Sequence, residues 1–160
     1  MTEEFDSEGW RKVRNDKLLE WVGDSHAVQF ILHMGQVAEV WDDLIDRDKD
    51  FDDNHIHSAF WALLIELPLN PFFDRFKGQL IPLMTVGINT WLDSNVMQDG
   101  DEEEQIQAYV LRRWLLELSI YVVYLTRGRE YAQQHSLEIR KFFTRYETFA
   151  DFRAKLGETV

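Results

Sequence analysis

Hydrophobic positions recur at the three- and four-residue spacing of an α-helix along almost the whole chain, and no stretch shows the alternation of a half-buried strand. The segment from 24 to 46 shows this best, because Asp24 and Ser25 are good N-cap residues at its start. Its predicted core stripe is Phe30, Met34, Val37, Trp41 and Leu44. The other predicted helices cover residues 15–22, 52–67, 70–78, 79–95, 101–126 and 129–156, the last as one helix or two.

Residues at the edges of these segments favour the same boundaries. Gly23 follows the first helix and predicts its end, Pro68 predicts the end of the 52–67 helix, and Asp101 is a candidate N-cap for the helix after it. The alternative caps of the 52–67 helix are Asp52, Asp53 and Asn54.

Together these elements predict an all-α fold, a single-domain bundle of six or seven helices over residues 1–160. The 101–126 segment is the most apolar, and we expect it to be the central helix. Residues 1–14 precede the first periodic segment and are a candidate disordered N-terminal tail.

The composition narrows the classes of protein that fit this fold. The 160 residues contain no cysteine, which excludes disulfides, thiolate zinc sites and cysteine nucleophiles. The N-terminus has no basic or apolar signal-peptide region, and the longest apolar run, residues 114–125, is too short to span a bilayer. We therefore expect a soluble, cytoplasmic protein with no membrane span.

The charge is strongly negative and unevenly distributed. The net charge of −12 argues against direct nucleic-acid binding through a basic surface, and it leaves cations or a basic protein partner as ligands. Residues 39–53 carry eight acidic side chains against two basic ones, whereas residues 127–155 carry seven basic side chains against four acidic ones. The acidic face of residues 39–57 is therefore the candidate functional surface.

Four of its acidic residues are spaced so that they share helix faces. Asp42 and Asp46 are four residues apart, and Glu39, Asp43 and Asp46 form a second line. Carboxylates placed in this way repel one another unless a cation neutralises them, and Mg²⁺ is bound by one or two carboxylates together with water and phosphate oxygens. The pattern predicts a site for Mg²⁺ or another divalent cation that faces a phosphate ligand.

The segment "EVWDDLIDRDKD", residues 39–50, resembles the second aspartate-rich motif of the trans-prenyltransferases, which belong to the isoprenoid synthases. Asp42, Asp43 and Asp46 match the DDxxD pattern of that family, and Glu39 stands where the family often has Gln. The resemblance implies an all-α fold in which these three aspartates hold Mg²⁺ that bridges to a diphosphate.

The loop after this motif suggests other cation sites. Asp46, Asp48 and Asp50 fit the first ligand positions of an EF-hand. Phe51 and His57 stand where that motif needs Gly and Glu, so an orthodox EF-hand is rejected and only loose calcium binding stays open.

Histidines next to the aspartate run suggest a different metal. His55 and His57, with Asp52 or Asp53, are candidate ligands for zinc or manganese. The interpretation of these histidines as helix-cap and surface residues is favoured over a metal site. A solvated acidic loop explains the whole aspartate run about as well as metal binding does.

Two further acidic residues lie inside strongly apolar segments, where a carboxylate is costly unless it is paired or bound to metal. Glu66 and Glu117 could each complete a metal site, but a structural salt bridge to an arginine is the favoured interpretation. The candidate arginines are Arg112, Arg113, Arg127 and Arg129. Arg127 and Arg129 are also candidate phosphate ligands, although cations near a helix C-terminus simply suit its dipole.

Most of the aromatic residues must lie in the core, and any left exposed would mark a surface for a protein partner or an oligomer. The set considered comprises Phe60, Trp61, Phe72, Phe73, Trp91, Trp114, Phe142 and Phe143.

Two functions remain open from the sequence. The favoured one is a non-enzymatic interaction protein whose 39–57 acidic face engages a basic partner or cations, in the manner of small acidic helical proteins encoded by viruses or mobile elements. The alternative is a magnesium-dependent helical enzyme, or a degenerate homologue of one, that acts on a phosphate or diphosphate ligand through residues 42–46. An enzyme requires the acids to converge on a pocket, whereas a binding protein spreads them over a convex surface.

Overall fold

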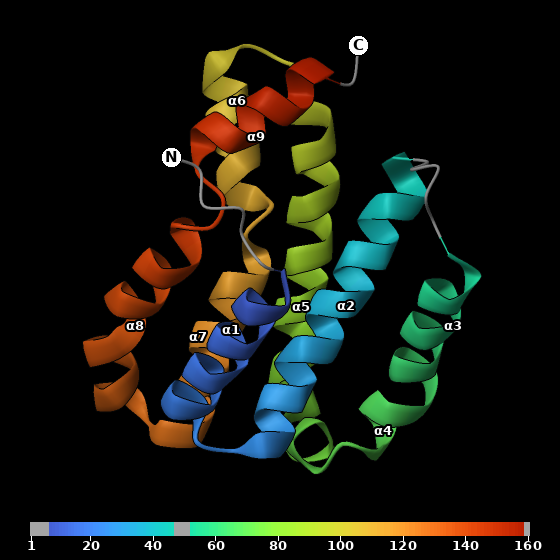
Figure 1. Ribbon diagram of the computed structural model, residues 1–160. Helices are drawn as coiled ribbons and strands as arrows, with labels where there is room; N and C mark the ends of the chain where they lie inside the picture. Colours follow the sequence, from blue (N-terminus) through green and yellow to red (C-terminus); the bar gives the residue numbers. More distant parts are fainter. Residues whose placement is uncertain (1–6, 47–51, 159–160) are drawn as a thin grey trace. The chain divides into compact units, whose positions relative to one another are not determined.

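The computed structural model describes residues 7–46 and 52–158 (Figure 1). Every regular element in this part of the chain is helical, which confirms the prediction of an all-α fold. The chain divides into two compact units. Unit 1 contains Met1–Arg75 and Leu125–Gly128, and unit 2 contains Phe76–Tyr124 and Arg129–Val160. The prediction of a single domain stays a prediction, and each unit is described by itself.

Unit 1 is built around α2, which packs against α1 on one side and against α3 and η1 on the other. Phe30 of α2 is fully buried and lies 5.8 Å from the rings of both Phe72 and Phe73. The helices of this unit are α1 (Ser7–Val22), α2 (Ser25–Asp46), α3 (Asp53–Trp61), the π-helical segment η1 (Ala62–Glu66) and α4 (Leu67–Leu69).

Two expectations for unit 1 need correction. The first helix begins at Ser7 and not near residue 15, so residues 7–14 of the candidate tail are helical. Phe30 and Met34 are buried as predicted, but Leu44 is 45% exposed and does not belong to the core stripe. Leu44 lies in the last turn of α2.

Pro68 does not end its helix, because α3, η1 and α4 follow one another without a break to Leu69. In η1 the Leu67 amide donates to the Ala62 carbonyl, five residues back, which widens the helix just before the proline. A wider turn relieves the clash between a proline ring and the carbonyl four residues earlier, here that of Leu64.

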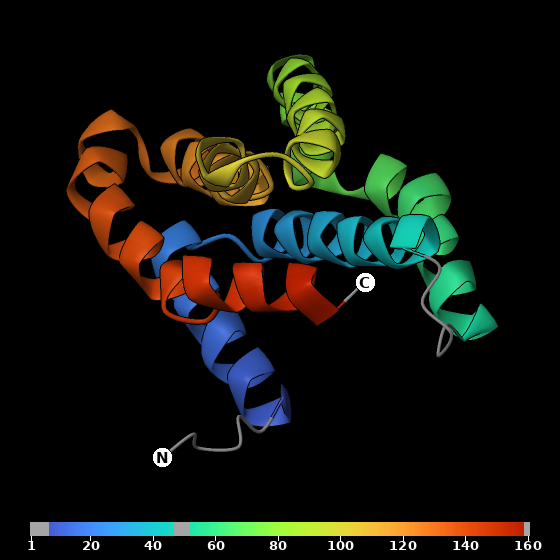
Figure 2. The same ribbon diagram turned by 90° about the horizontal axis from the view of Figure 1, so that it is seen from above.

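Unit 2 contains most of α5 (Pro71–Met97), then α6 (Glu102–Leu111), most of α7 (Trp114–Arg127), α8 (Arg129–Thr144) and α9 (Phe149–Glu158). Within this unit α5 runs beside α6 and α7 (Figure 2). One helix replaces the two predicted over 70–95, although Pro82 lies inside it. Pro82 and Gly78 are both exposed, so water can reach the Gly78 carbonyl that Pro82 leaves without an amide donor.

The predicted central helix is divided in two. Its apolar part, α7, buries Trp114, Leu118, Val122 and Val123, but a turn at Arg112–Arg113 separates α7 from α6. Within the described residues, counting α3–η1–α4 as one, the chain has eight continuous helical segments, among which α6 and α7 are separate.

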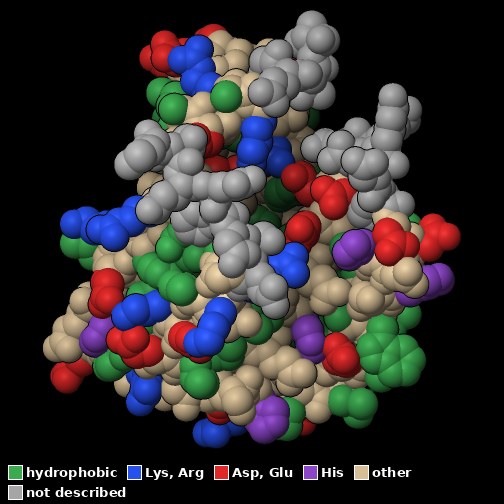
Figure 3. All heavy atoms as spheres, in the orientation of Figure 1, with side chains coloured by type: hydrophobic (Ala, Val, Ile, Leu, Met, Phe, Trp, Pro, Cys, Tyr) green, Lys and Arg blue, Asp and Glu red, His purple; other side chains and the backbone are tan. Residues whose placement is uncertain are grey.

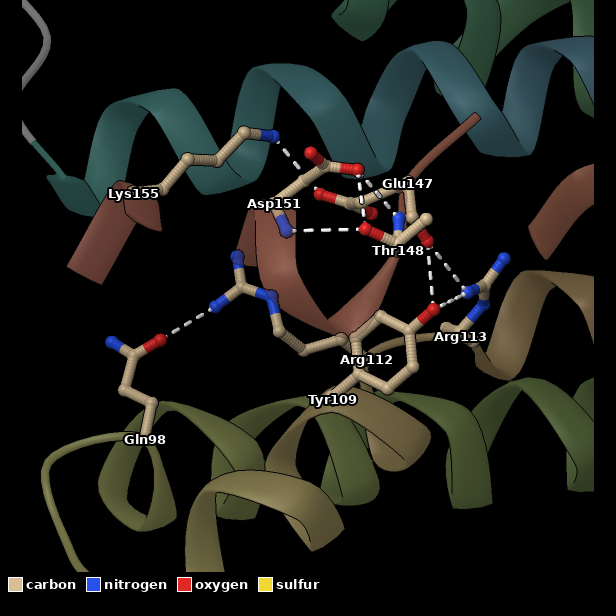
Figure 4. Close-up of polar contacts among 8 residues, drawn as sticks. All are labelled: Gln98, Tyr109, Arg112, Arg113, Glu147, Thr148, Asp151 and Lys155. Carbon is tan, nitrogen blue, oxygen red and sulfur yellow. Dashed lines mark hydrogen bonds and ion pairs between the residues drawn. The ribbon is translucent and has the colours of Figure 1, made fainter. Parts of the chain in front are cut away.

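Side chains around this turn explain the break (Figure 4). Arg112 donates to Gln98 at 2.8 Å, and Arg113 donates to the Glu147 carbonyl at 3.1 Å. Tyr109 donates to the same carbonyl at 2.7 Å and accepts from Arg113. The two arginines thus tie the turn to the end of α5 and to the segment before α9, where Thr148 and Asp151 form a capping pair (Figure 4).

Candidate functional site

Acidic side chains gather at the C-terminal end of α2. Glu39 is exposed, and Asp42 and Asp43 are half-buried. Helix α2 contains no lysine or arginine, so these carboxylates lie near the negative end of the helix dipole without a compensating cation of their own helix. Each such placement costs about 0.3–1 kcal/mol at an exposed helix end, which a cationic partner would offset.

Glu39 has a cationic neighbour from α1. Burial lowers the pKa of Arg14, the nearby charge of Arg11 lowers it further, and the charge of Glu39 acts in the opposite direction. Glu39 thus faces a cation of α1. Asp42 and Asp43 lie one turn further toward the C-terminal end of α2.

The acidic surface continues on α3. Asp52 is the N-cap of this helix and accepts from the Asn54 amide at 3.0 Å. Hydrogen bonds from the Asn54 backbone and side chain lower the pKa of Asp52, so its carboxylate stays charged. Asp53, His55 and His57 are exposed, and the two histidines, two residues apart on a helix, point to different sides.

The structure does not bring a metal-binding set together among the residues that it describes. No three acidic or histidine side chains there lie close enough to hold one ion. The side chain of Asp46 and residues 47–51, with Asp48 and Asp50, lie outside the described residues. The magnesium, calcium and zinc or manganese sites therefore stay predictions.

Glu66 is paired, as its apolar surroundings predicted, but with a histidine and not with an arginine. Its Oε2 lies 2.9 Å from Nε2 of His33 on α2. The other ring nitrogen of His33, Nδ1, is buried and has no hydrogen-bond partner among the described residues. Glu66 is the last residue of η1, so the π turn aims it at α2.

The α3–η1–α4 helix carries the largest unexpected feature, an exposed apolar surface. We call the five residues Phe60, Trp61, Leu64, Ile65 and Leu69 the apolar face; their exposed fractions are 56, 58, 67, 40 and 75%. Figure 3 shows hydrophobic side chains at the surface along this helix, with acidic and histidine side chains near the ends of α2 and α3.

The spacing of the apolar face makes it one continuous strip. Phe60 and Leu64 are four residues apart, as are Trp61, Ile65 and Leu69. The opposite side of the helix buries Ala59, Ala62 and Leu67. Phe60 and Trp61 belong to a set of aromatics that was expected to be mostly buried. The signal for their exposure was the pair of small residues on the other face, Ala59 and Ala62.

The acidic and apolar surfaces meet on α3. Asp53 and His57 lie seven and three residues before Phe60, which places them on the same side of the helix as the apolar face. Leu44 and Ile45, at the end of α2, are 45 and 53% exposed and add to the apolar surface of unit 1.

Glu117 of α7 forms an ion pair with Arg140 of α8, where Nη2 lies 2.7 Å from Oε2 and Nη1 contacts Oε1. The prediction of a salt bridge is confirmed, but the partner is none of the four arginines proposed. The hydrogen bonds from Arg140 lower the pKa of Glu117 below its ordinary value of 4.5.

This pair sets an expected pH dependence. Because the folded-state pKa of Glu117 is depressed, its stabilisation is present above about pH 4.5 and is lost as the pH falls through the folded-state pKa. The Glu117 side chain is 53% exposed, so we expect Glu117→Gln to cost only about 0.5 kcal/mol at pH 7. Urea unfolding at pH 7 and pH 3 checks this: the difference from the parent protein should be smaller at pH 3 than at pH 7, and an undiminished difference there would contradict it.

Arg127 has a structural contact. Its Nη2 donates to the Glu20 carbonyl at 3.3 Å, in the last turn of α1. Gly23 follows this helix with φ +68°, and a Cβ at Gly23 would lie 2.7 Å from Nε of Arg127. The guanidinium therefore covers the C-terminal end of α1, as expected for a cation at a helix C-terminus. Arg129 is exposed at the first position of α8, and phosphate binding by the two arginines stays a prediction.

Comparison with known proteins did not identify a family for the chain. No protein-family model, no curated protein and no solved structure matches the chain. None of the helices in the described part is both long enough and apolar enough to cross a membrane. The resemblance of residues 39–50 to the prenyltransferase motif stays a prediction.

Proposed function

We propose that this protein is a binding protein that captures a basic amphipathic segment of a partner protein on unit 1. The apolar face receives the apolar side chains of that segment. The acids at the C-terminal end of α2 and at the N-terminal end of α3 receive its lysines and arginines. The observation that carries the proposal is the apolar face itself, five large side chains exposed by 40–75% on one side of one helix. Contiguous apolar surface rimmed by polar residues is typical of protein interaction sites.

The arrangement of charge favours a basic partner. Asp53 lies on the same side of α3 as the apolar face, and Asp42 and Asp43 lie at the end of α2, which packs against α3. An amphipathic helix docks with apolar residues at three- and four-residue spacing, the spacing of Phe60, Leu64 and their neighbours here. Complementary charge then raises the association rate and selects against acidic segments.

The test uses a synthetic helical peptide of leucine and lysine, and a matched peptide in which glutamate replaces each lysine. Titration calorimetry should show saturable binding of the lysine peptide only, and binding that weakens as salt is added. The variant Leu64→Ser should bind at least about tenfold more weakly, since a central apolar contact is worth more than about 1.4 kcal/mol.

Leu137→Ser provides the matched control, because Leu137 of α8 is 60% exposed, close to the 67% of Leu64, and lies in unit 2. Leu137→Ser should bind like the parent protein. Equal binding of the two peptides, or equal losses in Leu64→Ser and Leu137→Ser, would rule out the proposed function.

A divalent cation is the alternative ligand of the acidic surface. The acids of α2 lie at the negative end of its dipole, which favours any cation there. Calorimetric titration of metal-stripped protein with Mg²⁺, Ca²⁺, Mn²⁺ and Zn²⁺ separates this alternative from the first. Stoichiometric binding that is lost in Asp42→Asn/Asp46→Asn supports it, and the absence of saturable binding by all four ions argues against it.

A further inference from the structure

Helix α5 carries a second exposed apolar surface, in unit 2. Residues 78–92 contain no charged side chain, although this stretch is about 22 Å of helix at 1.5 Å per residue. Ile81, Ile88 and Leu92 are 49, 39 and 46% exposed, and Val96 just beyond is 76% exposed. A helix face that contacts only water normally carries charged residues. The absence of charge on this face therefore indicates that it contacts a partner.

The exposed face has the spacing of a coiled-coil seam. Ile81, Thr85, Ile88 and Leu92 follow one another at intervals of four, three and four residues, as the a and d positions of a heptad do. A different side of α5 buries Leu80 and Trp91, and within unit 2 α6 and α7 run alongside the helix (Figure 2). The seam is thus distinct from the buried side of the helix.

We propose that this seam pairs with the same seam of a second copy of the chain, antiparallel, about a two-fold axis that crosses the seam midway between Thr85 and Ile88. In that register Ile81 packs against Leu92 of the second copy, and Thr85 packs against Ile88. Each apolar residue of one helix then meets an apolar or small residue of the other. The same surface patch serves both subunits, as a two-fold interface requires.

Charge selects the antiparallel orientation. Lys77 and Asp93 stand at opposite ends of the uncharged stretch, and both are exposed. Antiparallel pairing brings the end of α5 that carries Lys77 beside the end of the second copy's α5 that carries Asp93. Parallel pairing would place each lysine beside a lysine and each aspartate beside an aspartate, which is unfavourable.

Sedimentation equilibrium over a range of protein concentrations tests the proposal. We expect a weak dimer, because one helix pair of this length lies at the low end of specific interfaces. Ile88→Glu should be monomeric at every concentration, since it places two carboxylates next to the axis. Val86→Glu adds the same charge to the same helix at a residue that is 57% exposed but outside the seam, and it should keep the dimer.

The response to added salt distinguishes dimerisation from the binding of a basic peptide. Each subunit carries a net charge of −12, so screening should strengthen the dimer, whereas it should weaken the binding of a basic peptide. Leu64→Ser should leave the dimer unchanged, and Ile88→Glu should leave peptide binding unchanged. A parent protein that stays monomeric throughout, or a dimer that Ile88→Glu leaves intact, would overturn the proposal.

Disulfide trapping tests the orientation, and the chain has no cysteine of its own to interfere. Thr85→Cys and Ile88→Cys proteins are prepared separately, mixed and oxidised. The antiparallel register predicts that the mixed disulfide exceeds both homodimeric ones. Disulfides that form mainly within the Thr85→Cys or the Ile88→Cys population would contradict it.

Discussion

Gly87→Ala is expected to destabilise unit 2 by about 1–3 kcal/mol, although alanine is the better helix former by about 1 kcal/mol. Gly87 is buried in the middle of α5, and a Cβ there would lie 2.6 Å from Cδ2 of the Trp114 indole on α7. That distance is far below van der Waals contact. Trp114 is itself buried, so the indole has no open space into which to move.

The same helix offers a matched control for this substitution. Gly78 is exposed, and a Cβ there would have no neighbour within 4 Å among the described residues. Gly78→Ala should therefore raise stability by about 0.5–1 kcal/mol through the reduced entropy of the unfolded chain. Urea titration followed by circular dichroism should show shifts of opposite sign, and shifts of the same sign would mean that α5 does not approach α7 at Gly87.

Asn70→Ala is expected to cost about 2–4 kcal/mol, because one buried side chain there makes three hydrogen bonds. The Oδ1 atom of Asn70 accepts from the amides of Phe72 and Phe73 at 2.9 and 3.0 Å, which caps the N-terminus of α5. Its Nδ2 atom donates to the His26 carbonyl at 2.9 Å, at the start of α2. Alanine would leave all three backbone groups without this partner.

Asn70→Ser separates the two contributions. Serine keeps an oxygen that can cap α5 but loses the amide that reaches His26, so it should recover about 1 kcal/mol relative to alanine. Urea unfolding of the three proteins provides the measurement. Equal stability of Asn70→Ser and Asn70→Ala would show that the contact with His26, and not the cap, accounts for the loss.

The sequence predicted the helices where local chemistry decides them. Asp101 caps α6 and exchanges hydrogen bonds with Glu104, and Gly23 ends α1, because these effects depend only on neighbouring residues. The break at Arg112–Arg113 was not predictable in this way. Neither arginine disfavours a helix, and the turn depends on contacts of Arg112 and Arg113 with residues far away in the chain, such as Gln98 and Glu147.

The same distinction applies to the candidate site. The spacing of Asp42, Asp43 and Glu39 placed them correctly at the end of a helix, yet the sequence did not show that Arg14 lies near Glu39. Likewise, aromatic content alone could not separate Phe72, which is buried, from Phe60, which is 56% exposed. Exposure depends on which side of a helix its neighbours cover, and that is a property of the assembled unit.

The division of the chain has a consequence for the order in which the protein forms on the ribosome. Unit 1 is not a continuous segment, because Leu125–Gly128 belongs to it although residues 76–124 belong to unit 2. The C-terminal carbonyl of α1 at Glu20 receives its hydrogen bond from Arg127, more than a hundred residues later. Helix α1 therefore waits, with one end incomplete, until the ribosome has translated the hundred or so residues that separate Glu20 from Arg127.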